Sequence, residues 1–340
     1  MKTLIPILAV VSGLSILAFS PAIMAQSPSG ESIIVSVEEW EVPFDETRSR
    51  DPYVSPVNGK VYFAGQRADY IGHFDPDTGE FGYFDLDEGA GPHTVVVADD
   101  GTLWYAGNRD RHIGKMDPDT GEITRYEMDS DYARDPHTFD FDKDGNIWFT
   151  AQGGNGVGHF NTTTGETVVI PAITPNSRPY GIKMDRDDHR PWIALVGTNG
   201  LATVNPETME FEEIELPREE TRVRRLDVTS DGNVWYADFS AGYIGRYNPT
   251  DGSITEWETP NHENARIYAA LVDDKDRMWF SDSGTNPVKL YAFDTQSEEF
   301  VAEQTIESAN GSIRHMMYDV KTRSMWFGTD TGHIGRLVLN

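Results

Sequence analysis

An aromatic pair, or a close equivalent of one, recurs at nearly constant intervals along most of the chain. The pairs are Tyr62-Phe63, Trp104-Tyr105, Trp148-Phe149, Trp192-Ile193, Trp235-Tyr236, Trp279-Phe280 and Trp326-Phe327. Their first members are 42, 44, 44, 43, 44 and 47 residues apart. Seven units of one length indicate a repeat architecture, in which each unit buries its apolar residues against its neighbours.

The unit around Trp104 shows what each repeat contains. Short apolar or alternating stretches lie at residues 94–97, 103–106, 112–116 and 122–128, and turn sequences ending in Gly101 and Gly121 separate them. Such glycines accept the positive φ that hairpin turns require. Four short antiparallel strands per unit, without any stretch of helical period, are typical of a propeller blade. The sequence therefore predicts an all-β fold, a seven-bladed β-propeller.

The two ends of the repeat region indicate how the ring closes. The seventh unit stops at Asn340, soon after Ile334-Gly335, and so lacks a fourth strand. Residues 35–43 (VEEWEVP within them) closely match the fourth strand of the fifth unit at residues 254–260 (ITEWETP). We therefore predict that the N-terminal strand completes the last blade, which leaves no open sheet edge at the junction.

The first 25 residues have the layout of a secretory signal peptide. Lys2 precedes an apolar run from Leu4 to Phe19, and small residues lead to Ala25. The run is short for a membrane span and contains Pro6 and Gly13. The predicted organisation is a signal peptide at 1–25, a linker at 26–32 and one propeller domain at 33–340, with the mature protein periplasmic or secreted.

Composition excludes several classes of function. The chain has no cysteine, which rules out disulfide scaffolds and thiolate metal sites. Its 28 Lys and Arg against 56 Asp and Glu give a net charge of −28, which disfavours nucleic acid and anionic membrane surfaces as partners. The expected partner is a small-molecule ligand at the channel mouth, bound by a monomer.

Equivalent positions at the start of each innermost strand should form a ring around this mouth. Counting back from each aromatic pair gives three histidines, three tyrosines and one arginine, namely Tyr53, His93, His137, Tyr180, Arg224, Tyr268 and His315. Groups of this kind suit a ligand-binding site.

Arginines gather near the same positions. Arg178, Arg222 and Arg266 each lie two residues before a ring position, and Arg225 and Arg314 flank the ring. In so acidic a chain this favours a polar or anionic ligand group, because guanidinium groups match carboxylates. The alternative is that these arginines pair with blade acids such as Asp135 and Asp227 and serve only the architecture.

Several strings resemble the virginiamycin B lyase (streptogramin lyase) family over residues 33–340. They are GPHT (91–94), DPHT (135–138), RPYG (178–181), GNIWFT (145–150) and GYIGRY (242–247). The resemblance implies a seven-bladed propeller that opens a cyclic antibiotic at its ester bond by elimination, with the help of Mg²⁺. In that reaction a base removes the proton beside the carbonyl and a divalent cation stabilises the resulting negative charge.

The resemblance also implies roles for individual residues. His315 matches the family's general base, and Tyr268 replaces a substrate-contacting histidine. Of two glutamates that hold the metal in the family, one position is Ile313 and the other is Asp330, which makes Asp330 the candidate metal ligand. Asp238 or Asp282 are further oxygen ligands from which a site could be rebuilt. The predicted substrate contacts are Tyr268, His93, His137, Tyr180, Arg224 and Arg266.

Three functions follow from these observations. The first is an exported lyase-like enzyme acting on a cyclic or ester-containing molecule. The second is a non-catalytic periplasmic propeller that captures a ligand or partner. The third, a lactonase-type hydrolase, requires a central calcium held by inward acids and amides, whereas the predicted ring offers His and Tyr.

Overall fold

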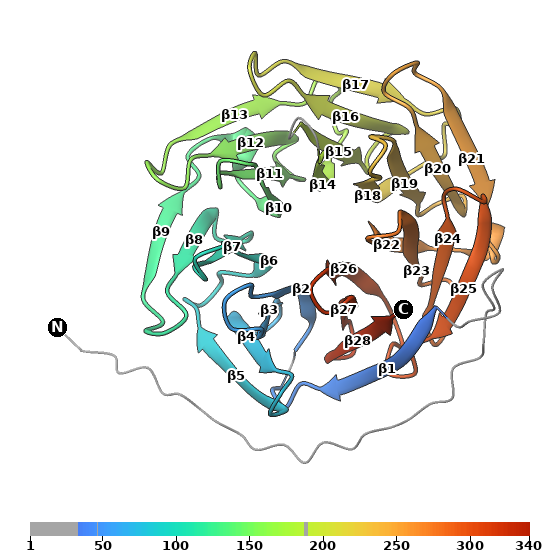
Figure 1. Cartoon of the computed structure of the whole chain (residues 1–340). Helices are drawn as coiled ribbons and strands as arrows, with labels where there is room; N and C mark the ends of the chain where they lie inside the picture. The colour runs from blue at the N-terminus through green and yellow to red at the C-terminus, as the bar shows by residue number, and fades with distance from the viewer. Residues whose placement is uncertain (1–32, 46, 187–189) are drawn as a thin grey trace.

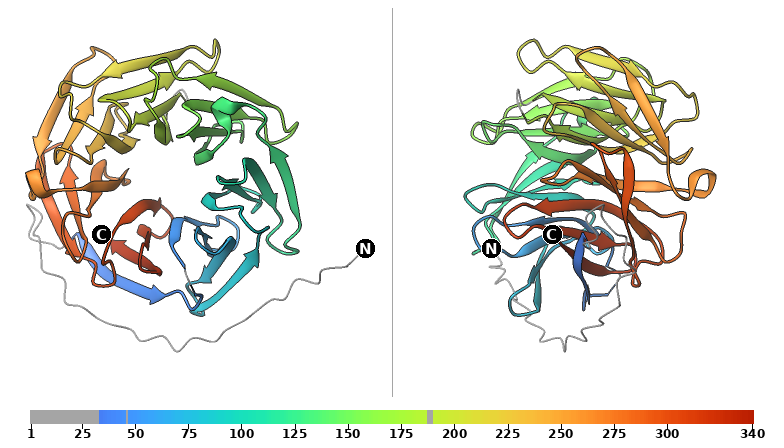
Figure 2. Two further views of the ribbon diagram at one scale, coloured as in Figure 1. Left: turned by 180° about the vertical axis from the view of Figure 1, so that it is seen from behind. Right: turned by 45° about the vertical axis from the view of Figure 1, so that its right-hand side comes forward.

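A computed structural model describes residues 33–45, 47–186 and 190–340, which form a closed ring of seven four-stranded antiparallel sheets (Figure 1). Each sheet is a blade whose first strand faces the central channel and whose fourth lies outermost, as Figures 1 and 2 show. The predicted seven-bladed β-propeller is confirmed. In the ranges just given there is no helix long and apolar enough to cross a membrane.

The strand bounds follow blade by blade, with two short 3-10 turns between blades. They are β2 (Ser49–Val54), β3 (Val61–Gly65), β4 (Tyr70–Asp75) and β5 (Glu80–Asp85) in blade 1; β6 (Pro92–Val97), β7 (Leu103–Gly107), β8 (His112–Met116) and β9 (Ile123–Glu127) in blade 2; η1 (Asp131–Ala133); β10 (Pro136–Phe141), β11 (Ile147–Ala151), β12 (Gly156–Phe160) and β13 (Thr167–Pro171) in blade 3; β14 (Pro179–Met184), β15 (Pro191–Leu195), β16 (Gly200–Val204) and β17 (Phe211–Glu215) in blade 4; β18 (Val223–Val228), β19 (Val234–Asp238), β20 (Tyr243–Tyr247) and β21 (Ile254–Glu258) in blade 5; η2 (His262–Asn264); β22 (Ile267–Val272), β23 (Arg277–Asp282), β24 (Lys289–Asp294) and β25 (Glu299–Thr305) in blade 6; and β26 (Ile313–Asp319), β27 (Ser324–Thr329), β28 (His333–Leu339) and β1 (Ile34–Glu41) in blade 7.

The repeated aromatic residues form the packing between blades. Trp104 of blade 2 packs with Phe139 and Phe149 of blade 3, and Trp279 of blade 6 packs with Phe327 of blade 7. The same arrangement recurs at the other junctions, including Trp326 of blade 7 against blade 1. The 42–47-residue spacing therefore reflects one buried anchor for each contact between blades.

The Ile-Gly pair of the third strand also has a packing reason. A Cβ added at Gly114 would lie 2.1 Å from ring atoms of Tyr105, and one at Gly335 would lie 2.2 Å from the ring of Phe327. The second aromatic residue of each of these pairs thus covers the glycine on the neighbouring strand. Any larger residue at these glycines would displace a buried ring.

The ring closes as the sequence predicts. Strand β1 pairs antiparallel with β28, with Trp40 opposite Ile334. The Trp40 ring stacks on Trp326 at 5.9 Å between centroids, and the backbone amide of Asn340 donates to the carbonyl of Ile33 over 2.9 Å. The first and last strands are therefore neighbours in one sheet (Figure 2). The predicted signal peptide and linker lie outside the described residues.

Removal of the closing strand tests this arrangement. A chain that starts at residue 44 should be largely insoluble, or should melt at least about 10 °C below a chain that starts at residue 26, because the edge of β28 and the face of Trp326 become exposed. Circular dichroism melting and the soluble fraction measure the effect. Equal solubility and equal melting temperature in the two chains would contradict the closure.

Candidate functional site

Each of the seven innermost strands carries a β-bulge near its start, one residue further along in β2 than in the others. The pairing register shifts in β2, β6, β10, β14, β18, β22 and β26, so that two residues of the inner strand oppose one residue of the next. A bulge of this kind redirects side chains. Here it brings consecutive residues such as Arg224 and Arg225 both into the network at the channel entrance.

The register corrects two members of the predicted ring. Arg314 follows Ile313 at the bulge as His93 follows Pro92, and Arg50 follows Ser49, which pairs with Gly65 as Pro92 pairs with Gly107. The ring around the entrance, called the rim ring below, consists of Arg50, His93, His137, Tyr180, Arg224, Tyr268 and Arg314. His315 lies one residue deeper along its strand and Tyr53 three residues deeper, so assigning them to this ring was wrong.

The error has a simple structural cause. In blades 1, 4 and 7 the inner-strand residue paired with the anchor aromatic lies nine positions before it, as Tyr53 lies before Tyr62. In the other four blades the separation is eight positions, as for Val96 and Trp104. The connecting hairpin is one residue longer in those three blades. Tyr180 lies 12 residues before Trp192, whereas the ring residues of the blades with the shorter hairpin lie 11 residues before their anchors. A count of 11 residues therefore finds the ring residue only in the blades with the shorter hairpin.

The rim ring is filled by its own side chains. The rings of His93 and His137 lie 3.5 Å apart between centroids, and the hydroxyl groups of Tyr180 and Tyr268 are hydrogen bonded. The Arg224 guanidinium lies over the ring of Tyr268 at 4.6 Å. Both histidines and both tyrosines are only 3% exposed. The mouth of the channel is therefore a packed surface, at which Arg224 and Arg314 stay half-buried.

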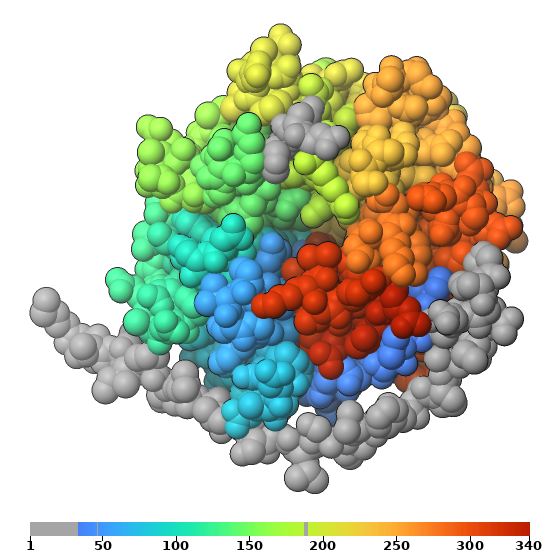
Figure 3. All heavy atoms as spheres, in the orientation of Figure 1, coloured from blue at the N-terminus to red at the C-terminus, as the bar shows by residue number. Residues whose placement is uncertain are grey.

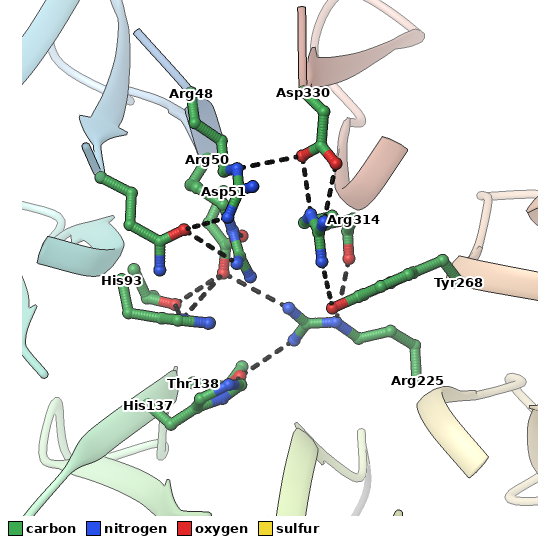
Figure 4. A network of polar contacts seen from close by, with 12 residues as sticks. Arg48, Arg50, Asp51, His93, His137, Thr138, Arg225, Tyr268, Arg314 and Asp330 are labelled. Atoms are coloured by element: carbon green, nitrogen blue, oxygen red, sulfur yellow. Dashed lines mark hydrogen bonds and ion pairs between the residues drawn. The ribbon is translucent and has the colours of Figure 1, made fainter. Parts of the chain in front are cut away.

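Asp330 is held by arginines. Both of its carboxylate oxygens accept hydrogen bonds from Arg314 at 2.6 Å, and the Nε of Arg48 lies 3.4 Å from one of them (Figure 4). Arg314 also donates to the Tyr268 hydroxyl over 3.0 Å. Asp330 thus fixes the orientation of Arg314 over the rim ring.

A second layer of side chains lies directly beneath the rim ring. We call its residues Asp51, Thr94, Thr138 and Arg225 the plug. Arg225 extends across the channel to Asp51 at 3.4 Å and donates to the hydroxyl of Thr138 over 3.0 Å (Figure 4). Thr94 donates to Asp51 over 2.6 Å. Burial raises the pKa of Asp51, but Arg50, His315 and Arg225 more than offset this and hold that pKa well below its usual value. These contacts join blades 1, 2, 3 and 5.

His315 belongs to this deeper layer and faces away from the rim ring. Together with Arg225 it lines a cavity of about 570 Å³ that opens at the other end of the channel. Burial lowers the pKa of His315 to about 3, so the imidazole is neutral, and its Nδ1 has no hydrogen-bond partner. A neutral histidine can accept a proton, although so low a pKa makes it a weak base.

The residues present do not fit a magnesium ion. Ile313 is fully buried and cannot ligate, and the two guanidinium groups at Asp330 occupy the place a cation would take. Asp238 and Asp282 instead accept backbone amide hydrogen bonds from Arg222 and Arg266. Within residues 33–45, 47–186 and 190–340, no three His, Asp or Glu side chains are grouped as metal ligands. This donor set differs from the oxygen-rich shell that Mg²⁺ requires.

The remaining predicted arginines lie outside the rim ring, and we call Arg178, Arg222 and Arg266 the outer arginines. Arg222 donates to the carbonyl of Thr221 over 2.6 Å and Arg266 to that of Ala265 over 2.6 Å. Their expected carboxylate partners are engaged elsewhere. Asp135 accepts from the backbone amide of Gly154, and Asp227 accepts from those of Val228 and Val272 at the far end of the channel. Asp135 and Asp227 are therefore not the partners of these arginines, but the architectural alternative holds for Arg225 and Arg314, which pair with Asp51 and Asp330.

A family model supplies the classification. The model for the virginiamycin B lyase family matches residues 35–337, which is most of the chain. The chain belongs to the virginiamycin B lyase family. The resemblance stated from the sequence motifs is confirmed, whereas the roles of the individual site residues remain predictions. No curated protein sequence gives a significant match.

Solved structures share the propeller fold with this family member. A streptogramin B lyase is 25% identical, with a TM-score of 0.79 over 89% of this chain and 97% of that one. A catalytically inactive histidine-to-alanine variant of virginiamycin B lyase from Staphylococcus aureus, with quinupristin, is 24% identical, with a TM-score of 0.79 over 90% and 99%. The WD40 propeller domain of Doa1 is 12% identical, with a TM-score of 0.72 over 88% and 95%.

The positive charge at the rim ring can be measured through Tyr268. Burial raises the pKa of Tyr268, but Arg50, Arg314 and Arg224 outweigh it and lower that pKa to about 8 from 10.0. One tyrosine should therefore ionise near pH 8 in the ultraviolet absorbance, and this step should vanish in Tyr268→Phe.

Stability should follow the same group. The pKa of Tyr268 is lower in the folded protein than in the unfolded protein, so ionisation of Tyr268 stabilises the folded state. This stabilisation is fully present above about pH 10 and is lost as pH falls through about 8. The free energy of unfolding should rise by up to about 3 kcal/mol across that window in the wild type relative to Tyr268→Phe. Parallel curves for the two proteins would contradict the lowered pKa.

Proposed function

We propose that this protein binds a small anionic molecule at the rim ring and the outer arginines. The observation that carries this proposal is a local surplus of positive charge in a chain of net charge −28. Five guanidinium groups, those of Arg48, Arg50, Arg224, Arg225 and Arg314, have two carboxylates among their contacts, Asp51 and Asp330.

Unused hydrogen-bond donors support the same conclusion. Nη2 of Arg50 and Nε of Arg224 are buried without a hydrogen-bond partner. Buried donors without partners are costly, and an acceptor from a ligand would satisfy them. The lowered pKa of Tyr268 has the same origin as the attraction for an anion, since a phenolate and a ligand carboxylate respond to one potential.

The packing defines how such a ligand would lie. The stacked rings of His93, His137 and Tyr180 form an apolar floor, and burial lowers the pKa of both histidines well below the usual value, so the floor is uncharged. A carboxylate or phosphate would lie over this floor and bind the half-buried Arg224 and Arg314, whose planar forks match two acceptor oxygens. Arg266 and the other outer arginines would extend the field around it.

A lyase of the family's kind is the second candidate, and one observation favours it. His315, which matches the predicted general base, is neutral and borders a cavity large enough for a ligand. Ile313 cannot ligate a metal and Asp330 is paired with Arg48 and Arg314, so an elimination at this site would lack the charge stabilisation that a metal ion supplies. The binding function therefore accounts for more of the geometry.

We also propose that the mature protein acts outside the cytoplasm, in the periplasm or secreted. This rests on the signal-peptide layout of residues 1–25. Mass spectrometry of the protein recovered from an expressing bacterium tests it, because cleavage after Ala25 would leave Gln26 as the first residue. Recovery of the uncleaved chain from the cytoplasm would contradict export.

Phenyl phosphate, benzoate and uncharged benzyl alcohol probe the rim in calorimetric titrations. The two anions should bind and the alcohol should not, and added salt should weaken the binding. Arg224→Gln should weaken phenyl phosphate binding about tenfold, equivalent to about 1.4 kcal/mol. Arg246→Gln, which alters an arginine on the outer half of blade 5, is the matched control. Equal affinity in Arg224→Gln and wild type, or tighter binding of the alcohol, would contradict the proposal.

The lyase candidate has its own assay. Purified protein incubated with a streptogramin B antibiotic and Mg²⁺, with and without EDTA, should leave the ring intact as followed by mass spectrometry. Linearisation of the antibiotic by the wild type that is lost with EDTA and in His315→Ala would instead establish lyase activity. It would also show that the protein has a metal site.

A further inference from the structure

The plug divides the central channel into two ends with different chemistry. Above it lies the rim ring, and below it a cavity of about 570 Å³ opens toward the hairpins that join the first and second strands of the blades. Figure 3 looks onto this end of the ring, where the surface is hollowed at the centre. We call this cavity the chamber. The anion-binding function proposed above does not use it as a ligand site, whereas the lyase candidate would place its substrate there beside His315.

The wall of the chamber is divided into a polar and an apolar side. At the height of the anchor aromatics each inner strand contributes one residue, and in ring order these are Tyr53, Val96, Asp140, Lys183, Asp227, Leu271 and Met317. All seven line the cavity. The charged residues come from the adjacent blades 3, 4 and 5, and the remaining four blades supply apolar side chains and one phenol.

The polar side carries more acid than base. The ammonium of Lys183 lies 3.3 Å from Asp140, and its pKa is raised chiefly by Asp140, with a further contribution from Asp227. Both oxygens of Asp227 accept backbone amides at 2.8 Å, from Val228 and Val272, which hold the carboxylate in place. Two carboxylates therefore share one ammonium.

The residues at the opening of the chamber do not offset this excess of acid. Asp185, Arg186 and Asp274 line it there, and Asp274 accepts a hydrogen bond from the Tyr318 hydroxyl over 2.8 Å. Asp274 is paired with Arg323 at 3.4 Å, and Arg225 at the inner end of the chamber is paired with Asp51. The excess of acid therefore lies at the level of the anchor aromatics, where Asp140 and Asp227 share Lys183.

We infer that the chamber is a second ligand site, for a small amphipathic amine. The ammonium would lie beside Asp227 and Asp140, and the apolar body would cover Leu271, Met317 and Val96. Burial of the apolar body supplies the main favourable free energy, and the paired carboxylates supply the selection for positive charge. This site differs from the rim ring in charge preference and in the end of the channel it occupies, so it does not depend on the function proposed above.

Three probes of one shape test the charge preference in calorimetric titrations. They are 2-phenylethylamine, 2-phenylethanol and 3-phenylpropanoate. The amine should bind at least about five times more tightly than the alcohol, and the carboxylate should show no binding that competes with the amine. Tighter binding of the alcohol than of the amine, or displacement of the amine by the carboxylate, would overturn the inference.

Two substitutions should act in opposite directions. Asp227→Asn should weaken amine binding at least about fivefold, and Lys183→Met should strengthen it, because the competing ammonium is removed. Asp251→Asn, at an exposed turn of blade 5, is the matched control and should leave the affinity unchanged. Equal amine affinity in both chamber variants and wild type would overturn the assignment.

A third variant covers the case in which Asp227→Asn does not fold. Met317→Trp fills part of the chamber without altering its charges and should abolish amine binding, while circular dichroism reports whether the ring is intact. Undiminished amine binding in a folded Met317→Trp protein would place the amine elsewhere. Phenyl phosphate binding to the same variant should persist, which separates this site from the rim.

Discussion

The pairing of β1 with β28 is the contact on which the rest of the ring depends. It joins residues 34–41 to residues 333–339, from opposite ends of the chain, and so fixes blade 7 against blade 1. That junction carries much of the site. Arg48, Arg50 and Asp51 come from the start of blade 1, whereas Arg314, His315 and Asp330 come from blade 7 and its loops. Without this closure, Arg48 and Asp330 would not be held close enough to form their ion pair.

A repeated bulge then converts this ring into a channel with two layers of inward side chains. Because consecutive residues of one strand face the channel, inner strands that supply the rim ring also supply the plug, in blades 1, 2, 3 and 5. The plug contains the buried ion pair between Arg225 and Asp51. Removal of Arg225 would strongly destabilise the fold, because Asp51 would stay buried with one fewer positive charge to offset its own. The plug therefore separates a cationic end from an acidic end and lets one short channel present two environments.

Much of this architecture could be predicted from patterns in the sequence. The seven anchor aromatics, the Ile-Gly strands and the match between residues 35–43 and 254–260 predicted the blades and the closure, and the structure confirms both. Five of the seven rim residues were also predicted. The misplaced two, Tyr53 and His315, follow from a hairpin that is one residue longer in three blades, which a count from the anchor cannot detect. The chamber was missed because Asp140, Lys183 and Asp227 come from three different blades.

The sequence by itself determined the number of blades, the packing between them, the closing strand and the family, because each of these depends on local patterns that repeat at a fixed period. Only the tertiary structure decided which side chains meet. Whether Asp330 binds a metal or an arginine, whether the rim is open or filled, and on which side of the plug His315 lies all depend on contacts across the channel. Those contacts join residues from different repeats, and no period along the chain encodes their distance.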